Sequence, residues 1–202
     1  MYIPKHFVNT NQAEIIAFMQ KYSFGTIITS SDNLPMATHI PFVIEERDGE
    51  VYILSHFAKA NPQAKELDNN ILVIFTEPHA YISPKHYEKE QSVPTWNYIA
   101  VHAYGRATIL SEQTEQLALM EKSILYYDAA YLEQWNGLSD EFKFRMLNGI
   151  VAFEIKVTSL EAKNKLSQNR SETERRNIIK AFESSGDGNE AVIAEYMKKG
   201  VM

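Results

Sequence analysis

The stretch that decides the fold is Tyr22–Ile44, YSFGTIITSSDNLPMATHIPFVI, which carries one formal charge, on Asp32. β-Branched and aromatic residues on both sides of the polar cluster SSDN at 30–33 predict two strands joined by a hairpin turn. A second cluster with similar residue types, RDGE at 47–50, follows a short apolar segment. Because such tight turns join antiparallel neighbours, we expect an antiparallel sheet rather than parallel strands linked by helices.

Other charge-free runs extend this pattern. The strands that it predicts are Tyr22–Ser31, Asn33–Ile44, Val51–Ala58, Asn69–Thr76, His79–Ser83 and approximately Tyr98–Leu110. Six strands with one short helix among them favour a closed antiparallel barrel. A further strand is expected at Gly149–Val157, after a more helical region.

Helices are expected on both sides of these strands. Asn11 with Glu14, and Ser171 with Glu174, have the spacing of helix caps ahead of apolar residues at helical intervals. The predicted helices follow Asn11, surround Leu117–Leu125, cover Leu138–Asn148, follow Ser171 and follow the turn Gly186–Gly188.

The composition excludes several classes of function. The 202 residues include no cysteine, which removes thiolate nucleophiles, cysteine-ligated zinc, iron–sulfur clusters and disulfides. A net charge of -6 argues against a broadly basic surface for nucleic acid. The six histidines lack metal-ligand spacing, so we expect no dedicated metal site. Without an export signal or a run of about eighteen apolar residues, the protein is expected to be cytoplasmic and without membrane contact.

Two segments combine polar groups with few charges. Residues 91–105, QSVPTWNYIAVHAYG, are uncharged, and their polar side chains, if buried, need an internal network, a ligand or a partner chain. Residues 55–62, SHFAKANP, place hydroxyl, imidazole, ammonium and carboxamide groups at a predicted strand end, a donor set suited to phosphate. The structural alternatives are an ordinary barrel strand and a polar connection in which Asn61 caps a short helix.

The segment Lys163–Lys180 is basic, with six basic and two acidic residues and a local balance of +4. Three roles suit it: binding a phosphate, contacting DNA, or forming a solvated helix face. The two helices expected after Ser171 resemble a helix-turn-helix only in outline, so a plain helical hairpin is favoured.

Several sequence blocks occur together in one known family. They are Met1–Pro4 with His6 and Phe7, Ala37–Phe42 (ATHIPF), His56–Gln63 (HFAKANPQ), Ala80–Pro84 (AYISP), Val93–Tyr98 (VPTWNY) and Lys165–Arg170 (KLSQNR). By these blocks, in this order and over nearly the whole chain, the protein resembles the PaiB family.

The resemblance implies an FMN-binding split barrel related to pyridoxamine-phosphate oxidases and flavin reductases, forming a homodimer with the flavin between subunits. The expected fold class is therefore α+β: an antiparallel six-stranded split β-barrel with peripheral helices and a C-terminal helical segment. Residues 1–160 would form the FMN-binding domain, and 161–202 a basic loop and helical hairpin packed on the barrel, not an independent domain. The implied function is negative transcriptional regulation of extracellular protease production and sporulation.

Roles in FMN binding follow from block position, and no catalytic residue is assigned. The phosphate and ribityl side would be held by Thr38, His39, Ser55, His56, Lys59 and Asn61. The ring would be walled or hydrogen-bonded by Trp96, Asn97 and His102, and the site would be closed by Lys165, Asn169 and Arg170.

Three other functions stay open. A flavin-dependent oxidoreductase, such as a flavin reductase or a pyridoxamine-phosphate-oxidase-like enzyme, would leave the hydride chemistry to the flavin. A repressor that contacts DNA directly would use Arg175 and Arg176, whereas indirect regulation needs no such contact. A haem-binding split barrel would use a strand histidine such as His39 as axial ligand.

Overall fold

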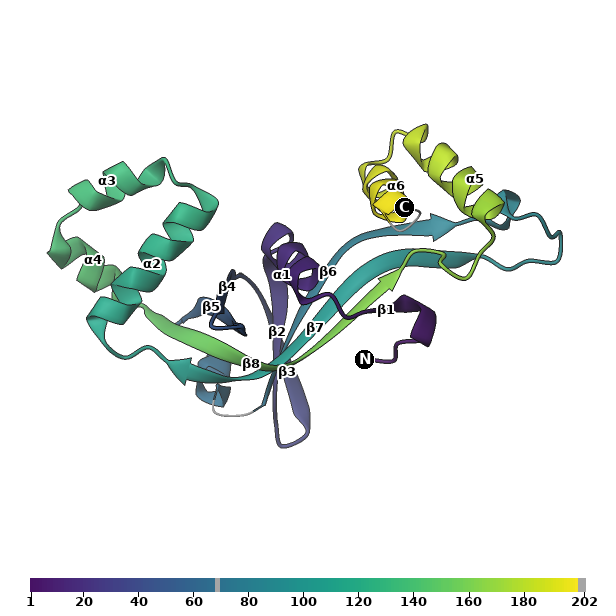
Figure 1. The fold of residues 1–202 in the computed structure, drawn as a ribbon. Coiled ribbons are helices and arrows are strands. Elements are labelled where there is room, and N and C mark those ends of the chain that lie inside the picture. Colours follow the sequence, from purple (N-terminus) through teal and green to yellow (C-terminus); the bar gives the residue numbers. More distant parts are fainter. Residues whose placement is uncertain (68–69, 200–202) are drawn as a thin grey trace. The chain divides into compact units, whose positions relative to one another are not determined.

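The computed structural model describes residues 1–67 and 70–199. Within them eight strands pair in the order β3-β2-β6-β7-β8-β5-β4, with β1 beside β8 (Figure 1). The strands are β1 Val8–Asn9, β2 Phe24–Ser31, β3 Leu34–Pro41, β4 Val43–Arg47, β5 Glu50–Ala58, β6 Ile71–Ile82, β7 Thr95–Ile109 and β8 Ile150–Lys165.

Six α-helices and three 3-10 helices complete the described residues. They are η1 Lys5–Phe7, α1 Gln12–Lys21, η2 Pro62–Glu66, η3 Pro84–His86, α2 Gln113–Tyr127, α3 Tyr131–Gly137, α4 Asp140–Leu147, α5 Glu172–Glu183 and α6 Gly188–Lys199. None of these helices has the length and apolar character needed to cross a membrane.

The chain forms two compact units. Unit 1 comprises Met1–Ile15, Thr76–Val101 and the described residues from Glu161 onward, and unit 2 comprises Ile16–Phe75 and His102–Leu160. The three long strands β6, β7 and β8 each contribute residues to both units.

Both predicted hairpin turns are confirmed. Ser31 pairs with Leu34 across β2 and β3, which leaves Asp32 and Asn33 as a two-residue loop with φ of 51° and 64°. The β4–β5 turn has the same form, with φ of 53° at Asp48 and 81° at Gly49. Two successive positive φ values define the type I′ turn, whose twist matches that of paired strands and which favours Asn, Asp and Gly.

The α+β class and the antiparallel pairing are confirmed, but the closed six-stranded barrel is wrong in two respects. The sheet has eight strands, and its order has separate ends at β3 and β4, so the pairing of the described strands does not close on itself. The predicted strand Asn33–Ile44 is in fact two, because β3 ends at Pro41 and β4 begins at Val43. Ser55 Oγ donates a hydrogen bond of 2.7 Å to the carbonyl of Pro41 at this break.

Two other strand boundaries differ from expectation. The runs Asn69–Thr76 and His79–Ser83 belong to a single strand, β6, which continues through Pro78; Asn69 itself lies outside the described residues. The strand expected to end at Val157 continues as β8 to Lys165. In this added part β8 pairs with β1, with Val8 opposite Lys163. Pairing with neighbouring strands therefore keeps β6 extended through Pro78 and β8 extended through its charged residues.

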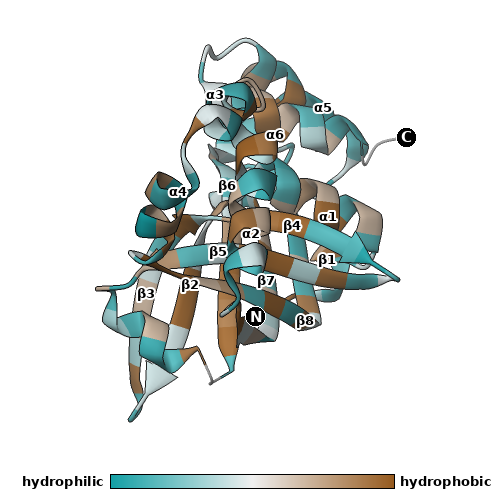
Figure 2. Cartoon of the chain, turned by 90° about the vertical axis from the view of Figure 1, so that its left-hand side faces the viewer, coloured by the Kyte–Doolittle hydropathy of each residue, from teal (hydrophilic) through white to brown (hydrophobic). Residues whose placement is uncertain are grey.

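In unit 2 the core is built from aromatic and aliphatic side chains of the strands. Phe42 packs edge-on against Phe75 at 5.6 Å between ring centroids, and Phe57 lies 5.1 Å from Phe153. These four side chains are almost fully buried. Figure 2 shows hydrophobic, brown stretches on several strands and on helix α6 as well, as expected where burial of apolar side chains supplies the stability.

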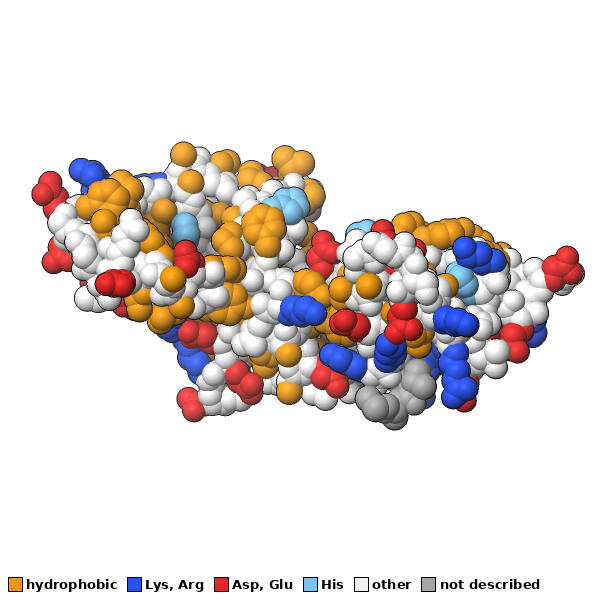
Figure 3. Space-filling model, turned by 90° about the horizontal axis from the view of Figure 1, so that it is seen from above, with side chains coloured by type: hydrophobic (Ala, Val, Ile, Leu, Met, Phe, Trp, Pro, Cys, Tyr) orange, Lys and Arg blue, Asp and Glu red, His pale blue; other side chains and the backbone are white. Residues whose placement is uncertain are grey.

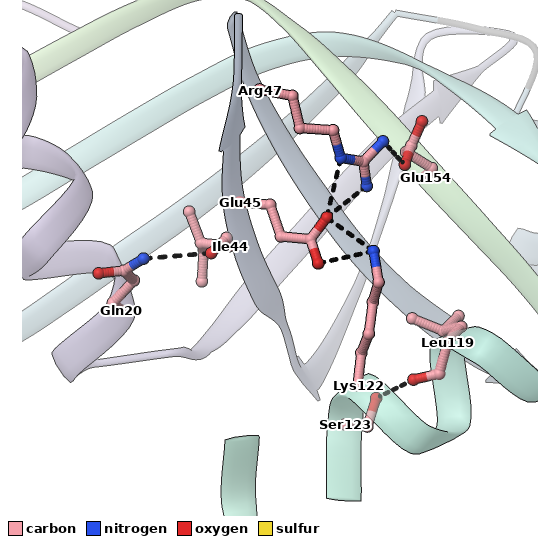
Figure 4. Close-up of polar contacts among 8 residues, drawn as sticks. All are labelled: Gln20, Ile44, Glu45, Arg47, Leu119, Lys122, Ser123 and Glu154. Carbon is pink, nitrogen blue, oxygen red and sulfur yellow. Dashed lines mark hydrogen bonds and ion pairs between the residues drawn. The ribbon is translucent and has the colours of Figure 1, made fainter. Parts of the chain in front are cut away.

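Helix α2 is fastened to the same unit by an apolar cluster and by charges. Leu119 packs with Val43, Leu54 and Ala152. Beside this cluster the Glu45 carboxylate accepts bonds from Lys122 of α2 and Arg47, and Arg47 also pairs with Glu154 of β8 (Figure 4).

These charged contacts alter the titration of Glu45. Burial alone would raise the pKa of Glu45, but the hydrogen bonds and charges of Lys122 and Arg47 outweigh burial and hold the pKa below its ordinary value. The carboxylate therefore stays charged at neutral pH and ties α2 to β4.

In unit 1 the helices α5 and α6 cover one face of the β6–β7 hairpin (Figure 1). Ile178, Phe182, Ile193 and Met197 of these helices are buried. Along β6 the side chains alternate, with Pro78, Ala80 and Ile82 buried and His79 and Tyr81 exposed. The exposed side of the hairpin therefore carries aromatic and imidazole groups.

Gly105 of β7 lies close against the backbone of β8. A Cβ at this position would lie 2.4 Å from the carbonyl oxygen of Lys156 and 2.6 Å from Cγ2 of Ile155 on β8. Since one of these atoms belongs to the backbone, the clash cannot be removed by rotating a side chain, and the strands themselves would have to move apart. Only glycine permits β7 and β8 to approach this closely.

Gly105→Ala is therefore expected to lower the free energy of unfolding by about 1–3 kcal/mol, because the new methyl group overpacks the β7–β8 contact. Urea denaturation followed by circular dichroism measures the change. Gly137→Ala is the control, since nothing lies within 4 Å of its added Cβ. Equal stability of the two variants would contradict the close approach.

Candidate functional site

The clearest polar network in unit 2 joins three side chains from β3 and η2. Asn61 Nδ2 donates to Thr38 Oγ1 at 3.2 Å, and the Thr38 hydroxyl donates to Gln63 Oε1 at 2.6 Å. Asn61 Oδ1 also accepts the backbone N–H of Gln63 at 3.0 Å and so caps η2. The predicted role of Asn61 as a helix cap is confirmed, and Thr38 is brought directly to it.

The residues predicted around this network lie on β5 and just after it. Ser55 is buried and gives its hydroxyl hydrogen to the carbonyl of Pro41. His56 is half-buried opposite Ala152 of β8, and burial lowers the pKa of its imidazole, which is therefore neutral at pH 7. Lys59 has an exposed side chain, while its backbone N–H donates to the carbonyl of Gly149 at 2.8 Å.

Two further predicted histidines belong to unit 2. His39 is exposed and follows Thr38 on β3, where it pairs with Thr26 of β2. His102 is half-buried on β7, with its ring 6.4 Å from that of Tyr104. The structure thus places His39 beside the Thr38–Asn61 contact in sequence and His102 on a different strand.

The other predicted residues belong to unit 1. Lys165 at the end of β8 donates hydrogen bonds to the Thr95 hydroxyl and, at 2.6 Å, to the carbonyl of Trp96. Burial, together with the positive charges of Lys163 and Arg170, lowers the pKa of Lys165. The ammonium groups of both lysines also lie over the Tyr98 ring, at 5.1 Å for Lys163 and 6.0 Å for Lys165.

Trp96 and Asn97 are neighbours in sequence but face different surroundings. Trp96 is 51% exposed and contacts His79 and Tyr81, with ring centroids 5.9 and 5.7 Å away. Asn97 is fully buried and accepts a hydrogen bond of 3.1 Å from the hydroxyl of Ser167. About half of the Trp96 side chain therefore stays accessible to solvent, whereas Asn97 ties β7 to the loop after β8.

The loop after β8 holds the last two predicted residues. The guanidinium of Arg170 stacks 3.8 Å from the centre of the Tyr87 ring and lies 4.0 Å from the Glu174 carboxylate. Asn169 is exposed. Ser167 reaches Asn97 with a φ of 61°, a left-handed conformation that serine rarely adopts.

The arginines invoked for DNA contact have local partners. Arg175 donates to the carbonyl of Met197 at 3.2 Å, and Arg176 pairs with Glu172 one helical turn away. Figure 3 shows Lys and Arg side chains interspersed with Asp and Glu in this part of the surface rather than gathered in one stripe. Such a mixed surface is that of a solvated helical hairpin.

The structure thus divides the twelve predicted residues into two groups. Thr38, His39, Ser55, His56, Lys59, Asn61 and His102 belong to unit 2, and Trp96, Asn97, Lys165, Asn169 and Arg170 belong to unit 1. Gln63, the buried centre of the unit 2 network, is not among the twelve predicted residues. Its one sequence signal is its place after Asn61-Pro62, in the first turn of a short helix whose cap is asparagine.

The arrangement of strands is shared with proteins of known structure. The flavocytochrome Anf3 from Azotobacter vinelandii matches with a TM-score of 0.64 at 12% identity, covering 81% of this chain and 72% of that one. An FAD and heme binding protein from Mycobacterium smegmatis matches with a TM-score of 0.60 at 13% identity, covering 78% of this chain and 73% of that one. The fold is that of the split-barrel proteins.

Sequence comparison reaches further. The chain is 44% identical over 203 residues to "Protease synthase and sporulation protein PAI 2" of Bacillus subtilis, covering 98% of this chain and 97% of the relative. The family model described as "Putative FMN-binding domain" matches residues 1–159. The chain belongs to this FMN-binding family, which confirms the resemblance to PaiB proteins and agrees with the predicted cofactor.

The lowered pKa of His56 has a measurable consequence. The unfolded chain binds a proton at higher pH than the folded one, so the contribution of His56 to stability is lost as pH falls through the ordinary histidine range. We expect the imidazole signals of His56 in an NMR titration to move at lower pH in the native protein than in urea. Identical midpoints would contradict the burial, and His56→Gln identifies the signals.

Proposed function

We propose that this protein binds FMN and acts, as a cytoplasmic homodimer, as a negative regulator of extracellular protease production and sporulation. The observation that carries the regulatory part is the 44% identity, over 98% of the chain, to a Bacillus subtilis protein named for protease synthesis and sporulation. An alignment of this extent leaves no large part of either chain unmatched, so a shared role is the simplest account.

The donor set of unit 2 fits the phosphate of FMN. A phosphomonoester is a dianion with three strong acceptor oxygens, and it is best met by a cation and by directed N–H and O–H donors. The exposed ammonium of Lys59 and the half-buried carboxamide of Asn61 lie within three positions of each other at the end of β5. The neutral His56 can donate one N–H without competing charge.

The bound group would supply the chemistry that the side chains lack. FMN carries reversible hydride and electron transfer in its ring, and the protein contributes binding and electrostatics. The residues proposed to donate to the phosphate are His39, His56, Lys59 and Asn61. Thr38 and Ser55, predicted for the same side of the flavin, give their hydroxyl hydrogens to Gln63 and to the carbonyl of Pro41, so we propose that they hold their neighbours in place. The predicted ring contacts of Trp96, Asn97 and His102, and the closing role of Lys165, Asn169 and Arg170, stay predictions.

The domain division proposed here follows the sequence analysis. Residues 1–160 would carry the flavin, and 161–202 would form a basic loop and helical hairpin packed on the barrel. The family model ends at residue 159, close to this boundary. The helical hairpin is closely packed within unit 1, where Arg175 of α5 reaches the carbonyl of Met197 on α6.

A homodimer is supported by apolar side chains left on the surface of unit 2. Leu34 and Met36 on β3 are 73% and 37% exposed. They are two positions apart and therefore lie on the same face of the strand, where neighbouring exposed apolar groups are typical of an interaction surface. A second copy of the chain would remove them from water.

FMN binding is tested with the phosphate-free flavin as reference. The wild-type protein is expected to show flavin absorbance or to bind added FMN. Lys59→Ala is expected to raise the dissociation constant for FMN by roughly 10- to 100-fold, which corresponds to the loss of one charge-assisted contact. Riboflavin, which has no phosphate, is expected to bind both proteins equally. Isothermal titration gives the dissociation constants.

The control for this experiment is Lys65→Ala, which removes another exposed lysine in the same unit, on η2. It is expected to bind FMN as the wild type does. Equal losses of FMN affinity in the two lysine variants would mean that Lys59 acts only through its general charge and not through a direct contact. A protein that binds neither flavin would refute the cofactor part of the proposal.

Regulation and assembly are tested together in Bacillus subtilis cells that lack their own PAI 2 protein. Expression of this chain is expected to lower secreted protease activity and spore counts. Leu34→Asp is expected to shift the purified protein from dimer to monomer in light scattering and to abolish the repression, because a charge is placed in the proposed interface. Leu125→Asp is the control, because the Leu125 side chain on α2 is 54% exposed and lies outside the proposed interface.

Unchanged protease and spore levels with the wild-type chain would refute the regulatory part. A monomeric wild-type protein would refute the homodimer without affecting the cofactor.

A further inference from the structure

The Gln63 side chain of η2 joins that helix to β2 and β3 in unit 2. It is fully buried. Its Nε2 donates to the carbonyl oxygens of Ile27 at 3.2 Å and Met36 at 3.1 Å, and its Oε1 accepts the Thr38 hydroxyl at 2.6 Å. Every polar atom of this amide therefore has a partner, and the partners belong to two paired strands.

These partners dictate which way the hydrogen bonds run. An amide has two N–H donors, and both are consumed by backbone carbonyls, which accept only. The amide oxygen must then accept, so the Thr38 hydroxyl has to donate to Gln63 and can only accept from Asn61. The order of donation is Asn61 to Thr38 to Gln63, and it cannot reverse.

The same order fixes the orientation of Asn61. Its Oδ1 is held by the N–H of Gln63, and one hydrogen of its Nδ2 is given to Thr38. A carboxamide nitrogen carries two hydrogens, so the second stays available to an acceptor outside the network. Asn61 is half-buried, which lets a ligand reach that hydrogen.

We infer that Gln63 is a positioning residue that aims the Asn61 carboxamide as a donor at a phosphomonoester, and so sets the preference for FMN over riboflavin. The inference rests on the proposed binding of FMN by unit 2. Gln63 itself is buried and touches no ligand. It acts through Thr38 and Asn61, whose rotamers would otherwise be free to exchange donor and acceptor.

The test compares the dissociation constants of FMN and riboflavin in Gln63→Met, which keeps the length of the side chain and removes its polar atoms. We expect the preference for FMN to fall about tenfold or more, the value of one misdirected bond to a charged group, with riboflavin affinity kept. Thr38→Val is expected to reproduce the loss, and the double variant to add nothing to either single change, because both break one chain of bonds.

Gln116→Met is the matched control. The Gln116 amide also donates to a backbone carbonyl of unit 2, that of Leu110 at 2.9 Å, but lies outside the network. Its FMN preference is expected to equal that of the wild type. Thermal melts of all variants without ligand separate a loss of stability from a loss of preference.

The outcomes divide cleanly. A wild type that binds neither flavin refutes the proposed function and this inference with it. The positioning role alone is overturned if the wild type prefers FMN and Gln63→Met keeps that preference. It is also overturned if Gln63→Met lowers the affinity for both flavins equally. Should Gln63→Met fail to fold, Thr38→Val serves instead, since it removes the hydroxyl through which Gln63 reaches Asn61. An unaltered FMN preference in Thr38→Val overturns the inference as well.

Discussion

The contact on which the rest of unit 2 depends is the backbone packing of β7 on β8 at Gly105. The missing side chain lets the Lys156 carbonyl oxygen lie 2.4 Å from the place where a Cβ would stand. Lys156 in turn pairs with Tyr52 of β5, and the same β5–β8 register places Ser55 opposite Phe153 and His56 opposite Ala152. A shift of β8 away from β7 would therefore move the strand that leads into Lys59.

The candidate phosphate site owes its character to the direction of its hydrogen bonds rather than to a concentration of charge. Carbonyls of β2 and β3 orient a buried amide, the amide orients a hydroxyl, and the hydroxyl orients a carboxamide. In unit 1 the cationic side chains of Lys165 and Arg170 instead contact other groups of the protein. Lys165 bonds to Thr95 and Trp96, and Arg170 stacks on Tyr87.

Local chemistry in the sequence predicted the local features of the fold. The turns at Asp32-Asn33 and Asp48-Gly49, the cap at Asn61 and the Ser171–Glu174 capping box are all present, because each depends on residues within four positions. Strand limits were harder to predict. β6 continues past Pro78, since pairing with neighbouring strands outweighs one lost donor.

The lysines near the end of β8 misled for a related reason. Lys163 and Lys165 indicated a basic loop, but both lie on the strand, where the Tyr98 ring compensates their partial burial. Thr38 and Asn61 were each predicted as site residues, but their hydrogen bond could not be predicted because it depends on how β3 and η2 pack in the fold. Gln63 was missed because a glutamine on a short helix is ordinarily exposed, and its place after Asn61-Pro62 was its one signal in the sequence.

The outer strand β3 carries proline at both ends of its pairing with β2, opposite Ser30 and Phe24. Pro35 and Pro41 are an even number of residues apart, so both would direct the missing N–H to the same side, away from β2. That side keeps Ala37 and His39 as its donors, too few for a regular ladder with a foreign strand. The protein can therefore be concentrated, or meet other newly made chains, without growing its sheet at this margin, and contacts made at β3 have to proceed through side chains.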